Sequence, residues 1–361
     1  MSIMIYVLIG TKAQLIKMAP VMRALDDAAL AYEFVLTGQH AETMEDLISD
    51  FNLRDPDWYF VKPSEADTVH RLLTWIIKAF TGGFRGFSQC KPGDLILVHG
   101  DTVSTLIGAI LGKLKRIKVV HVEAGLRSFN YLHPFPEEIV RVLTTRLSDY
   151  FICQDSRAVQ NLMKIRIPSS SILNTGANTL LDSLRIVSES STDKVDKERD
   201  PYCIVTLHRS ENITNQERFD FLMSTVNDVS ERIKVLFVMH PVTRKKLQTS
   251  RWLSEFEKSE HIELLARMPY TQFVKLMKGA LFMISDGGSN QEESSYLGLP
   301  CLLMRKATER HEGIGGNVVL SNYDIDVINS FIDDTIQGRR MDSKIKDVNP
   351  SKQIAEFMSN L

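Results

Sequence analysis

The sequence predicts an α/β protein with two Rossmann-like, doubly wound domains that face a central cleft. Three observations lead to this prediction. Short runs rich in β-branched residues alternate with amphipathic stretches of helical length along the chain. A polar segment, 188–200, has too few apolar residues to pack against a core and separates two such series. The chain has 361 residues, 43% of them hydrophobic, which is enough for two cores.

The first series runs from the N-terminus to about residue 175. Its predicted strands are short apolar runs of the kind that is buried on both faces of a parallel sheet, and they cover 3–9, 33–36, 95–98, 118–122 and 150–153. Apolar residues at helical spacing predict helices between them over 15–25, 103–114 and 137–147.

The second series begins near residue 202. Its predicted strands are 202–207, 234–239, 262–265, 281–285 and 301–304, and its clearest helical stretches are 219–229 and 273–276. A closing helical stretch covers 352–358. We therefore predict a first domain over 1–175, a nucleotide-binding domain over 176–345, and a C-terminal segment, 346–361, whose helix packs back on the first domain.

Composition excludes several classes of protein. The 43 Lys and Arg residues nearly balance the 45 Asp and Glu residues, so no basic field attracts nucleic acid or an anionic membrane surface. The four cysteines are far apart and form no Cys-x-x-Cys pair, which argues against a disulfide scaffold and a zinc site. No apolar run reaches the roughly 20 residues of a membrane span, and the N-terminal run lacks a basic leader. We expect a cytoplasmic protein.

Charged residues follow several strands of the first series, at the sheet edge where α/β proteins bind ligands. Lys12 and Lys17 lie at a helix start that favours anions, although both also fit a solvated surface. Asp101 follows a predicted strand, and on this stretch alone its favoured role is to cap the next helix. Glu123 follows a buried run, and Glu137 begins a predicted helix.

A carboxylate at the end of a buried run must be paired, hydrogen-bonded or functional, because an isolated buried charge is costly. Acid/base catalysis is one interpretation of Glu123 and Glu137. The alternative is a buried ion pair with Arg127 or Arg141.

The second series shows the same pattern. His208 and His240 each follow a predicted strand and fit either phosphate binding or a structural hydrogen bond. The turn over 285–293 contains Gly288 and Ser289 at a helix start, a geometry that suits a pyrophosphate. Glu293 lies one helical turn further on, where it suits ribose hydroxyls. Arg310 adds a guanidinium for phosphate.

Taken together, a series of motifs resembles the UDP-N-acetylglucosamine 2-epimerase family, in family order along the chain. They are Gly10-Thr11-Lys12, Thr37-Gly38-Gln39-His40, Gly100-Asp101-Thr102, His121 to Arg127, Pro136-Glu137-Glu138, Asn178-Thr179, His208-Arg209 with Glu211-Asn212, Gln291-Glu292-Glu293 and Thr308-Glu309-Arg310. The resemblance implies the two-domain glycosyltransferase-B fold. It also implies a UDP-sugar substrate, no metal or redox cofactor, and a homodimer.

Members of this family eliminate UDP from UDP-GlcNAc, which leaves 2-acetamidoglucal, and then add back UDP to give UDP-ManNAc or water to give free ManNAc. By motif, the resemblance assigns the acid/base carboxylates to Asp101, Glu123 and Glu137, and the histidine beside the diphosphate to His208. Positions that match or neighbour the nucleotide site, together with the candidates above, are Lys12, Lys17, Arg141, His240, Gly288, Ser289, Glu293 and Arg310.

The chain also departs from the family pattern. Lys12-Ala13-Gln14 stands where most members have Arg-Pro-Glu, and Gly287-Gly288-Ser289 stands where they have Ser-Gly-Gly. Glu42 replaces a Gln that helps non-hydrolysing members to bind a second UDP-GlcNAc. Hydrolysing members typically carry Arg-Ala-Asp in the first loop, so the chain is closer to the non-hydrolysing pattern.

The expected function is therefore a non-hydrolysing epimerase that supplies an activated sugar for a surface polysaccharide. Four alternatives stay open: a modified UDP-HexNAc substrate, a hydrolysing epimerase, a glycosyltransferase of the same fold, and a non-catalytic nucleotide-sugar sensor.

Overall fold

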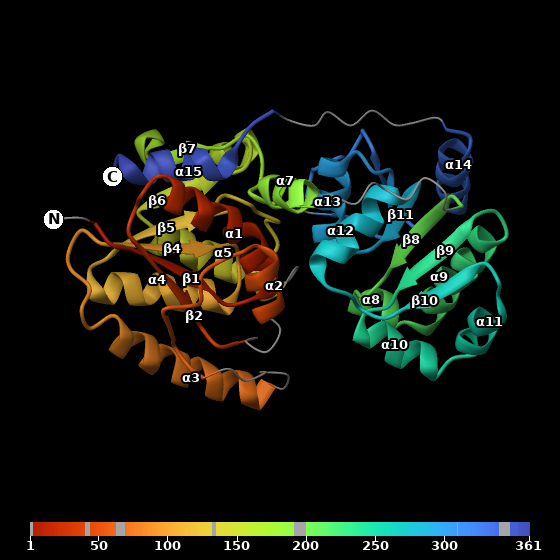
Figure 1. Cartoon of the computed structure of the whole chain (residues 1–361), viewed down its shortest axis with the longest axis horizontal. Helices are drawn as coiled ribbons and strands as arrows, with labels where there is room; N and C mark the ends of the chain where they lie inside the picture. Colours follow the sequence, from red (N-terminus) through yellow and green to blue (C-terminus); the bar gives the residue numbers. More distant parts are fainter. Residues whose placement is uncertain are drawn as a thin grey trace. The chain divides into compact units, whose positions relative to one another are not determined.

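The computed structural model describes residues 3–39, 44–62, 69–131, 135–190, 200–308, 310–338 and 347–361. The chain divides into two compact units (Figure 1). The first unit comprises Met1–Ile186 and Asp347–Leu361, and the second comprises Val187–Lys346. Most of the polar segment 188–200 lies outside the described residues, as do His40, Glu42 and Glu309.

The first unit contains a seven-stranded parallel sheet with the order β3-β2-β1-β4-β5-β6-β7. Its strands are β1 (Ile5–Ile9), β2 (Tyr32–Leu36), β3 (Trp58–Tyr59), β4 (Leu95–His99), β5 (Lys118–Val122), β6 (Tyr150–Cys153) and β7 (Ile172–Asn174). Its helices are α1 (Lys12–Asp27), α2 (Glu45–Asp50), α3 (Val69–Gly86), α4 (Val103–Lys115), α5 (Glu137–Leu147), α6 (Ser156–Lys164) and α15 (Pro350–Ser359), and α7 (Leu180–Ser190) begins in this unit.

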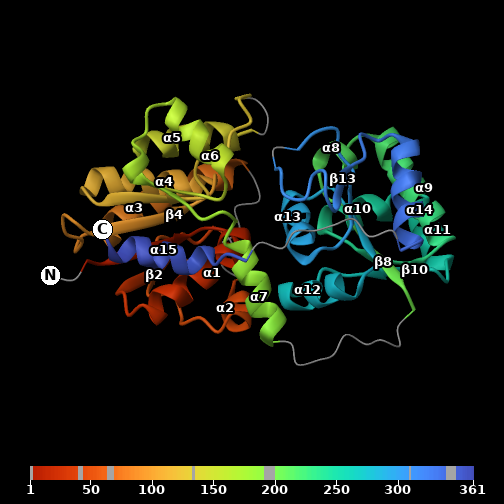
Figure 2. The ribbon, with the colours of Figure 1, turned by 90° about the horizontal axis from the view of Figure 1, so that it is seen from above.

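Helices cover both faces of this sheet (Figure 2). Because side chains alternate along a strand, Tyr6 and Leu8 of β1 point to the face where Trp75 of α3 and Ile107 of α4 complete an apolar core. Helices α1 and α15 pack together on the opposite face. The backbone amide of Ser351 donates to Asp182, 2.8 Å away, and this bond ties the start of α15 to α7.

The second unit has a six-stranded parallel sheet with the order β10-β9-β8-β11-β12-β13. Its strands are β8 (Tyr202–Thr206), β9 (Lys234–Val238), β10 (Ile262–Leu265), β11 (Phe282–Ser285), β12 (Cys301–Leu303) and β13 (Val318–Leu320). Its helices are α8 (Ser210–Ile213), α9 (Gln216–Ser230), α10 (Pro241–Gln248), α11 (Trp252–Lys258), α12 (Tyr270–Gly279), α13 (Gly288–Leu297) and α14 (Ile325–Ile336).

Two apolar layers sandwich this sheet as well. Phe219 of α9, Phe256 of α11 and Phe331 of α14 share one cluster with β8 and β9 side chains. Met277 of α12 packs in the cluster on the other face. The predicted α/β class with two doubly wound, Rossmann-like sheets is confirmed. Within the described part of the chain, none of the helices combines the length and apolar character needed to cross a lipid bilayer.

Candidate functional site

Asp101 and Arg141 form an ion pair at the carboxyl end of β4. Arg141 Nε and its NH2 group donate to the Asp101 Oδ2 atom at 2.8 and 2.6 Å. The helix cap expected of Asp101 is wrong, because the side chain of Thr102 accepts the Thr105 amide and caps α4. Gly100 has φ +68°, in a region that glycine adopts more readily than other residues. The chain turns at this glycine, between the end of β4 and Asp101. Asp101 is thus oriented by a buried arginine.

Glu123 directly follows β5 and has a left-handed backbone, with φ +64°. Such a conformation is unfavourable for residues other than glycine, and residues that adopt it are often found at functional sites. Its Oε2 atom accepts from Lys17 Nζ at 2.5 Å and from Asn178 Nδ2 at 2.6 Å, and His99 Nε2 lies 3.5 Å away. The interpretation of a pair with Arg127 or Arg141 is therefore wrong for Glu123, since its cationic partner is Lys17 on α1.

Glu137 and Glu138 begin α5 and have different surroundings. Glu138 is fully buried and accepts from Arg127 Nε at 2.6 Å and from the Ser128 amide at 2.9 Å. Burial alone raises the pKa of a carboxyl, but these two donors outweigh it and lower the pKa of Glu138. Glu137 is half-buried, and its Oε2 atom is buried with no hydrogen-bond partner among the described residues.

In the first unit, the buried side chain of His121 lies near both Asp101 and Glu123. Its Nε2 atom lies 2.8 Å from the carbonyl oxygen of Gly100. Complete burial lowers the pKa of His121, against the charges of Asp101 and Glu123 that raise it. The carboxylates of Asp101 and Glu123 are therefore both close enough to His121 for their charges to act on it.

In the second unit, Asp286 organises the residues that follow β8. This fully buried carboxylate accepts from the backbone amide of His208 at 2.9 Å, from that of Arg209 at 3.0 Å and from Asn212 Nδ2 at 2.9 Å. His208 Nδ1 lies 3.3 Å from the same carboxylate. His208 also lines the pocket described next.

That pocket has a volume of about 240 Å³ and is lined by His208, Arg209, Gly287, Gly288, Ser289, Asn290 and Arg310. The helix α13 begins there without a side-chain cap, so its first amides point outward with no intrahelical partner. Arg310 pairs with buried Glu292, and its carbonyl accepts from Gln291 Nε2 at 3.1 Å. A helix start beside a guanidinium suits a phosphate.

His240 and Glu293 flank these residues. The His240 ring centroid lies 5.3 Å from that of His208, and its Nδ1 atom is buried without a hydrogen-bond partner in the described structure. Burial lowers the pKa of both histidines, and the nearby Arg267 lowers them further. Glu293 accepts from Asn290 Nδ2 at 3.0 Å. Burial and the Glu293 carboxylate raise the pKa of Tyr270 well above its ordinary value.

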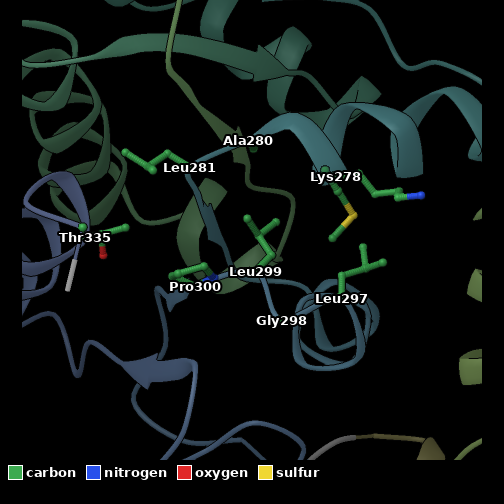
Figure 3. A pocket seen from close by; sticks show the side chains of 10 residues that line it. Lys278, Ala280, Leu281, Leu297, Gly298, Leu299, Pro300 and Thr335 are labelled. Carbon is green, nitrogen blue, oxygen red and sulfur yellow. The ribbon is translucent and has the colours of Figure 1, made fainter. Parts of the chain in front are cut away.

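A separate pocket of about 180 Å³ lies at the opposite edge of this sheet, before β11 and β12 (Figure 3). Its lining combines the apolar side chains of Leu281, Leu297 and Leu299 with the polar side chains of Lys278 and Thr335. None of the predicted site residues lines it. Among the described residues, no group of His, Cys, Asp or Glu side chains is arranged to hold a metal ion.

A family model described as UDP-N-acetylglucosamine 2-epimerase matches residues 23–359. The chain belongs to the UDP-N-acetylglucosamine 2-epimerase family. A UDP-N-acetylglucosamine 2-epimerase of Methanococcus maripaludis is 32% identical over 350 residues, 92% of each chain. One from Neisseria meningitidis is 31% identical over 329 residues, 86% of this chain and 84% of its own.

Solved structures of the 2-epimerase family agree with the fold. The Methanocaldococcus jannaschii UDP-GlcNAc 2-epimerase, in complex with UDP-GlcNAc and UDP, has a TM-score of 0.84 at 25% identity, over 99% of this chain and 100% of that chain. The Neisseria meningitidis enzyme bound to UDP-GlcNAc has a TM-score of 0.85 at 26% identity, with the same coverage. The glycosyltransferase-B-like fold implied by the motifs is confirmed.

Within each unit, the predicted site residues of this 2-epimerase family member come together to different extents. In the first unit Lys17 contacts Glu123, and Arg141 contacts Asp101. Lys12 is the first residue of α1, the helix that carries Lys17. In the second unit the pocket gathers His208, Gly288, Ser289 and Arg310. Gln14, Glu138, Asn178 and Asp286 make buried polar contacts at these sites, and the sequence analysis assigned no role to them. Glu138 and Asn178 stand in quoted motifs, whereas Gln14 and Asp286 are found only from their contacts in the structure.

Proposed function

We propose that the protein is a non-hydrolysing UDP-GlcNAc 2-epimerase, which eliminates UDP and adds it back to the other face of the sugar. The observation that carries this proposal is the set of buried or half-buried carboxylates at one sheet edge of the first unit, in a chain that belongs to this family throughout. The relatives' structures with UDP-GlcNAc support the substrate.

Elimination requires a base that removes the C2 proton, and inversion requires a second group that returns a proton to the opposite face. We assign these tasks to Asp101, Glu123 and Glu137. The buried Oε2 atom of Glu137, which lacks a hydrogen-bond partner among the described residues, suits a group that exchanges a proton with substrate. The contact with Lys17 holds the Glu123 carboxylate in one position, as a group that transfers a proton requires.

We propose that the second unit holds the UDP. The diphosphate would lie at the start of α13, where Ser289, Arg310 and His208 line the pocket. Donors aimed at the departing diphosphate stabilise the charge that develops as the C1–O bond breaks. Glu293, on the first turns of the same helix, would bind the ribose hydroxyls.

Proton NMR of the purified protein with UDP-GlcNAc in deuterated buffer tests the reaction. A UDP-ManNAc signal with deuterium at C2 is the expected result. Free ManNAc together with UDP would assign the protein to the hydrolysing branch. Transfer of the sugar to an added acceptor, without exchange at C2, would favour a glycosyltransferase, and UDP-GlcNAc binding without turnover would favour a sensor.

We further propose that the protein is a cytoplasmic homodimer and that its product enters surface polysaccharide synthesis. Light scattering after size-exclusion chromatography tests the dimer, and cell fractionation tests the location.

A further inference from the structure

Asn290, in the first turn of α13, has a side-chain amide that is held at both ends. The hydroxyl of Ser285 accepts from the backbone amide of Gly287 at 3.1 Å and donates its single hydrogen to Asn290 Oδ1, also at 3.1 Å. Asn290 Nδ2 donates to a carboxylate oxygen of buried Glu293 at 3.0 Å. Because an ionised carboxylate only accepts, these two neighbours fix which end of the amide carries the nitrogen.

The same amide lines the pocket at the start of α13. An NH2 group carries two hydrogens, and the contact with Glu293 uses one of them. The other polar groups around the pocket are the side chains of His208 and Arg310 and the first amides of the helix. Asn290 therefore adds a neutral side-chain donor to a site whose other groups suit an anion.

The Asn290 amide takes the space that a side chain at position 287 would occupy. A Cβ atom on Gly287 would lie 2.5 Å from Asn290 Oδ1 and 2.9 Å from Cε1 of His208. The backbone of Gly287, with φ −83° and ψ 132°, is open to any residue, so only these two side chains crowd a larger one. Most family members have a serine here, as the sequence analysis notes. In this chain the polar group comes from position 290.

We propose that Asn290 binds the diphosphate of UDP in this protein, in place of a side chain at position 287. This inference rests on the proposed function, which puts the diphosphate at the start of α13. A hydrogen bond to a charged oxygen is stronger than one between neutral groups. The contacts with Ser285 and Glu293 hold the amide in one orientation before the ligand arrives, so binding costs little side-chain entropy.

Calorimetric titration with UDP tests the proposal. Asn290→Ala removes the donor, and we expect UDP to bind about 10-fold more weakly, because hydrogen bonds to charged groups are among the stronger ones. Gly287→Ser alone should also weaken binding, since its Cβ atom displaces the amide. Asn329→Ala, at an exposed position of α14 in the same unit, is the control and should keep the parent affinity.

The double variant Gly287→Ser/Asn290→Ala places the polar group at position 287. Its hydroxyl enters the space that the amide has left, so the UDP affinity should return to within about threefold of the parent value. The matched variant Gly287→Ala/Asn290→Ala carries the same Cβ atom without the hydroxyl and should bind UDP no more tightly than Asn290→Ala. Recovery in the first double variant and not in the second is a result that a general loss of structure does not produce.

Two results would overturn the proposal and leave the proposed function in place. One is a parent-like UDP affinity for Asn290→Ala. The other is a Gly287→Ser/Asn290→Ala variant that binds UDP no more tightly than its matched alanine variant. Thermal unfolding of each variant reports its folded fraction, so that weak binding by unfolded protein is recognised. A parent protein that does not bind UDP would refute the proposed function and this inference with it.

Discussion

Arg141 donates two hydrogen bonds to a single oxygen of Asp101, from Nε at 2.8 Å and from NH2 at 2.6 Å. The side chain of Arg141 is almost fully buried, and its NH1 group also lies 3.5 Å from Glu138. The guanidinium therefore lies between a carboxylate that we assign to catalysis and one that is buried for structural reasons. Because the guanidinium is rigid and planar, the position of α5 determines where the Asp101 carboxylate lies after β4.

The first prediction concerns this geometry. Arg141→Lys keeps the charge but replaces two directed bonds by one point charge, so Asp101 loses its orientation. We expect kcat for UDP-GlcNAc epimerisation to fall about 10- to 100-fold, since misplacing a reacting group by about 1 Å costs up to about 100-fold. Steady-state kinetics measure the effect. Arg146→Lys, at an exposed position in the last turn of the same helix, is the matched control and should retain parent kinetics.

The second prediction concerns the buried pair of Lys17 and Glu123, whose side chains are 5% and 4% exposed. Lys17→Met leaves the Glu123 charge buried without its cation, which typically costs about 3–5 kcal/mol of stability. Urea unfolding should show this loss. The double variant Lys17→Met/Glu123→Gln should recover part of it, because the uncompensated charge is gone. If the double variant is as unstable as the sum of the two single variants, the pair does not act as a unit.

The third prediction concerns pH. Burial lowers the pKa of His208 in the folded protein, so the folded state loses stability as the pH falls from the ordinary histidine pKa of about 6.5 toward this lowered pKa. A bound diphosphate favours the imidazolium form and raises that pKa. UDP should therefore bind about 3- to 10-fold more tightly at pH 6.5 than at pH 8.

Isothermal titration calorimetry at both pH values measures this dependence. His208→Asn should remove most of it, because the titrating ring is absent. His261→Asn, at an exposed position of the same unit, should leave it unchanged. A variant at His208 with the parent dependence would contradict the assignment of that histidine to the diphosphate.

Several elements could be predicted from the sequence because their patterns are local. Strand β5 and helix α5 begin and end where the apolar periodicity places them. Helix α1 starts three residues before the expected position 15, because Thr11 and Gln14 form a capping box that precedes the apolar pattern. Strands β3 and β7 have two and three residues, too few for any periodicity, and were not predicted.

The site was less predictable because its partners are distant in sequence. One interpretation paired Glu123 with Arg127 or Arg141, whereas the lysine that contacts it lies 106 residues earlier, on α1. Asp101 and Thr102 are adjacent and both are good helix caps. Local rules do not choose between them. The buried Arg141 decides the outcome, because it binds Asp101 and leaves the cap to Thr102.

The last prediction concerns Gly288, at the first position of α13. A Cβ atom there would lie 2.9 Å from Nε and 3.2 Å from Cδ of Arg310. Gly288→Ala therefore displaces the guanidinium and weakens its ion pair with Glu292. Because alanine is a better helix former than glycine, we expect little change in thermal stability but about tenfold weaker UDP binding, about 1.4 kcal/mol.

A double-variant cycle isolates the cause. In an Arg310→Ala background there is no guanidinium to displace, so adding Gly288→Ala should weaken UDP binding no further. Calorimetric titration of the two single variants and the double variant gives the coupling free energy, which should be close to the full effect of Gly288→Ala alone. Additive losses would show instead that the methyl group itself blocks the diphosphate, and that the small size of Gly288 serves the ligand directly and not Arg310.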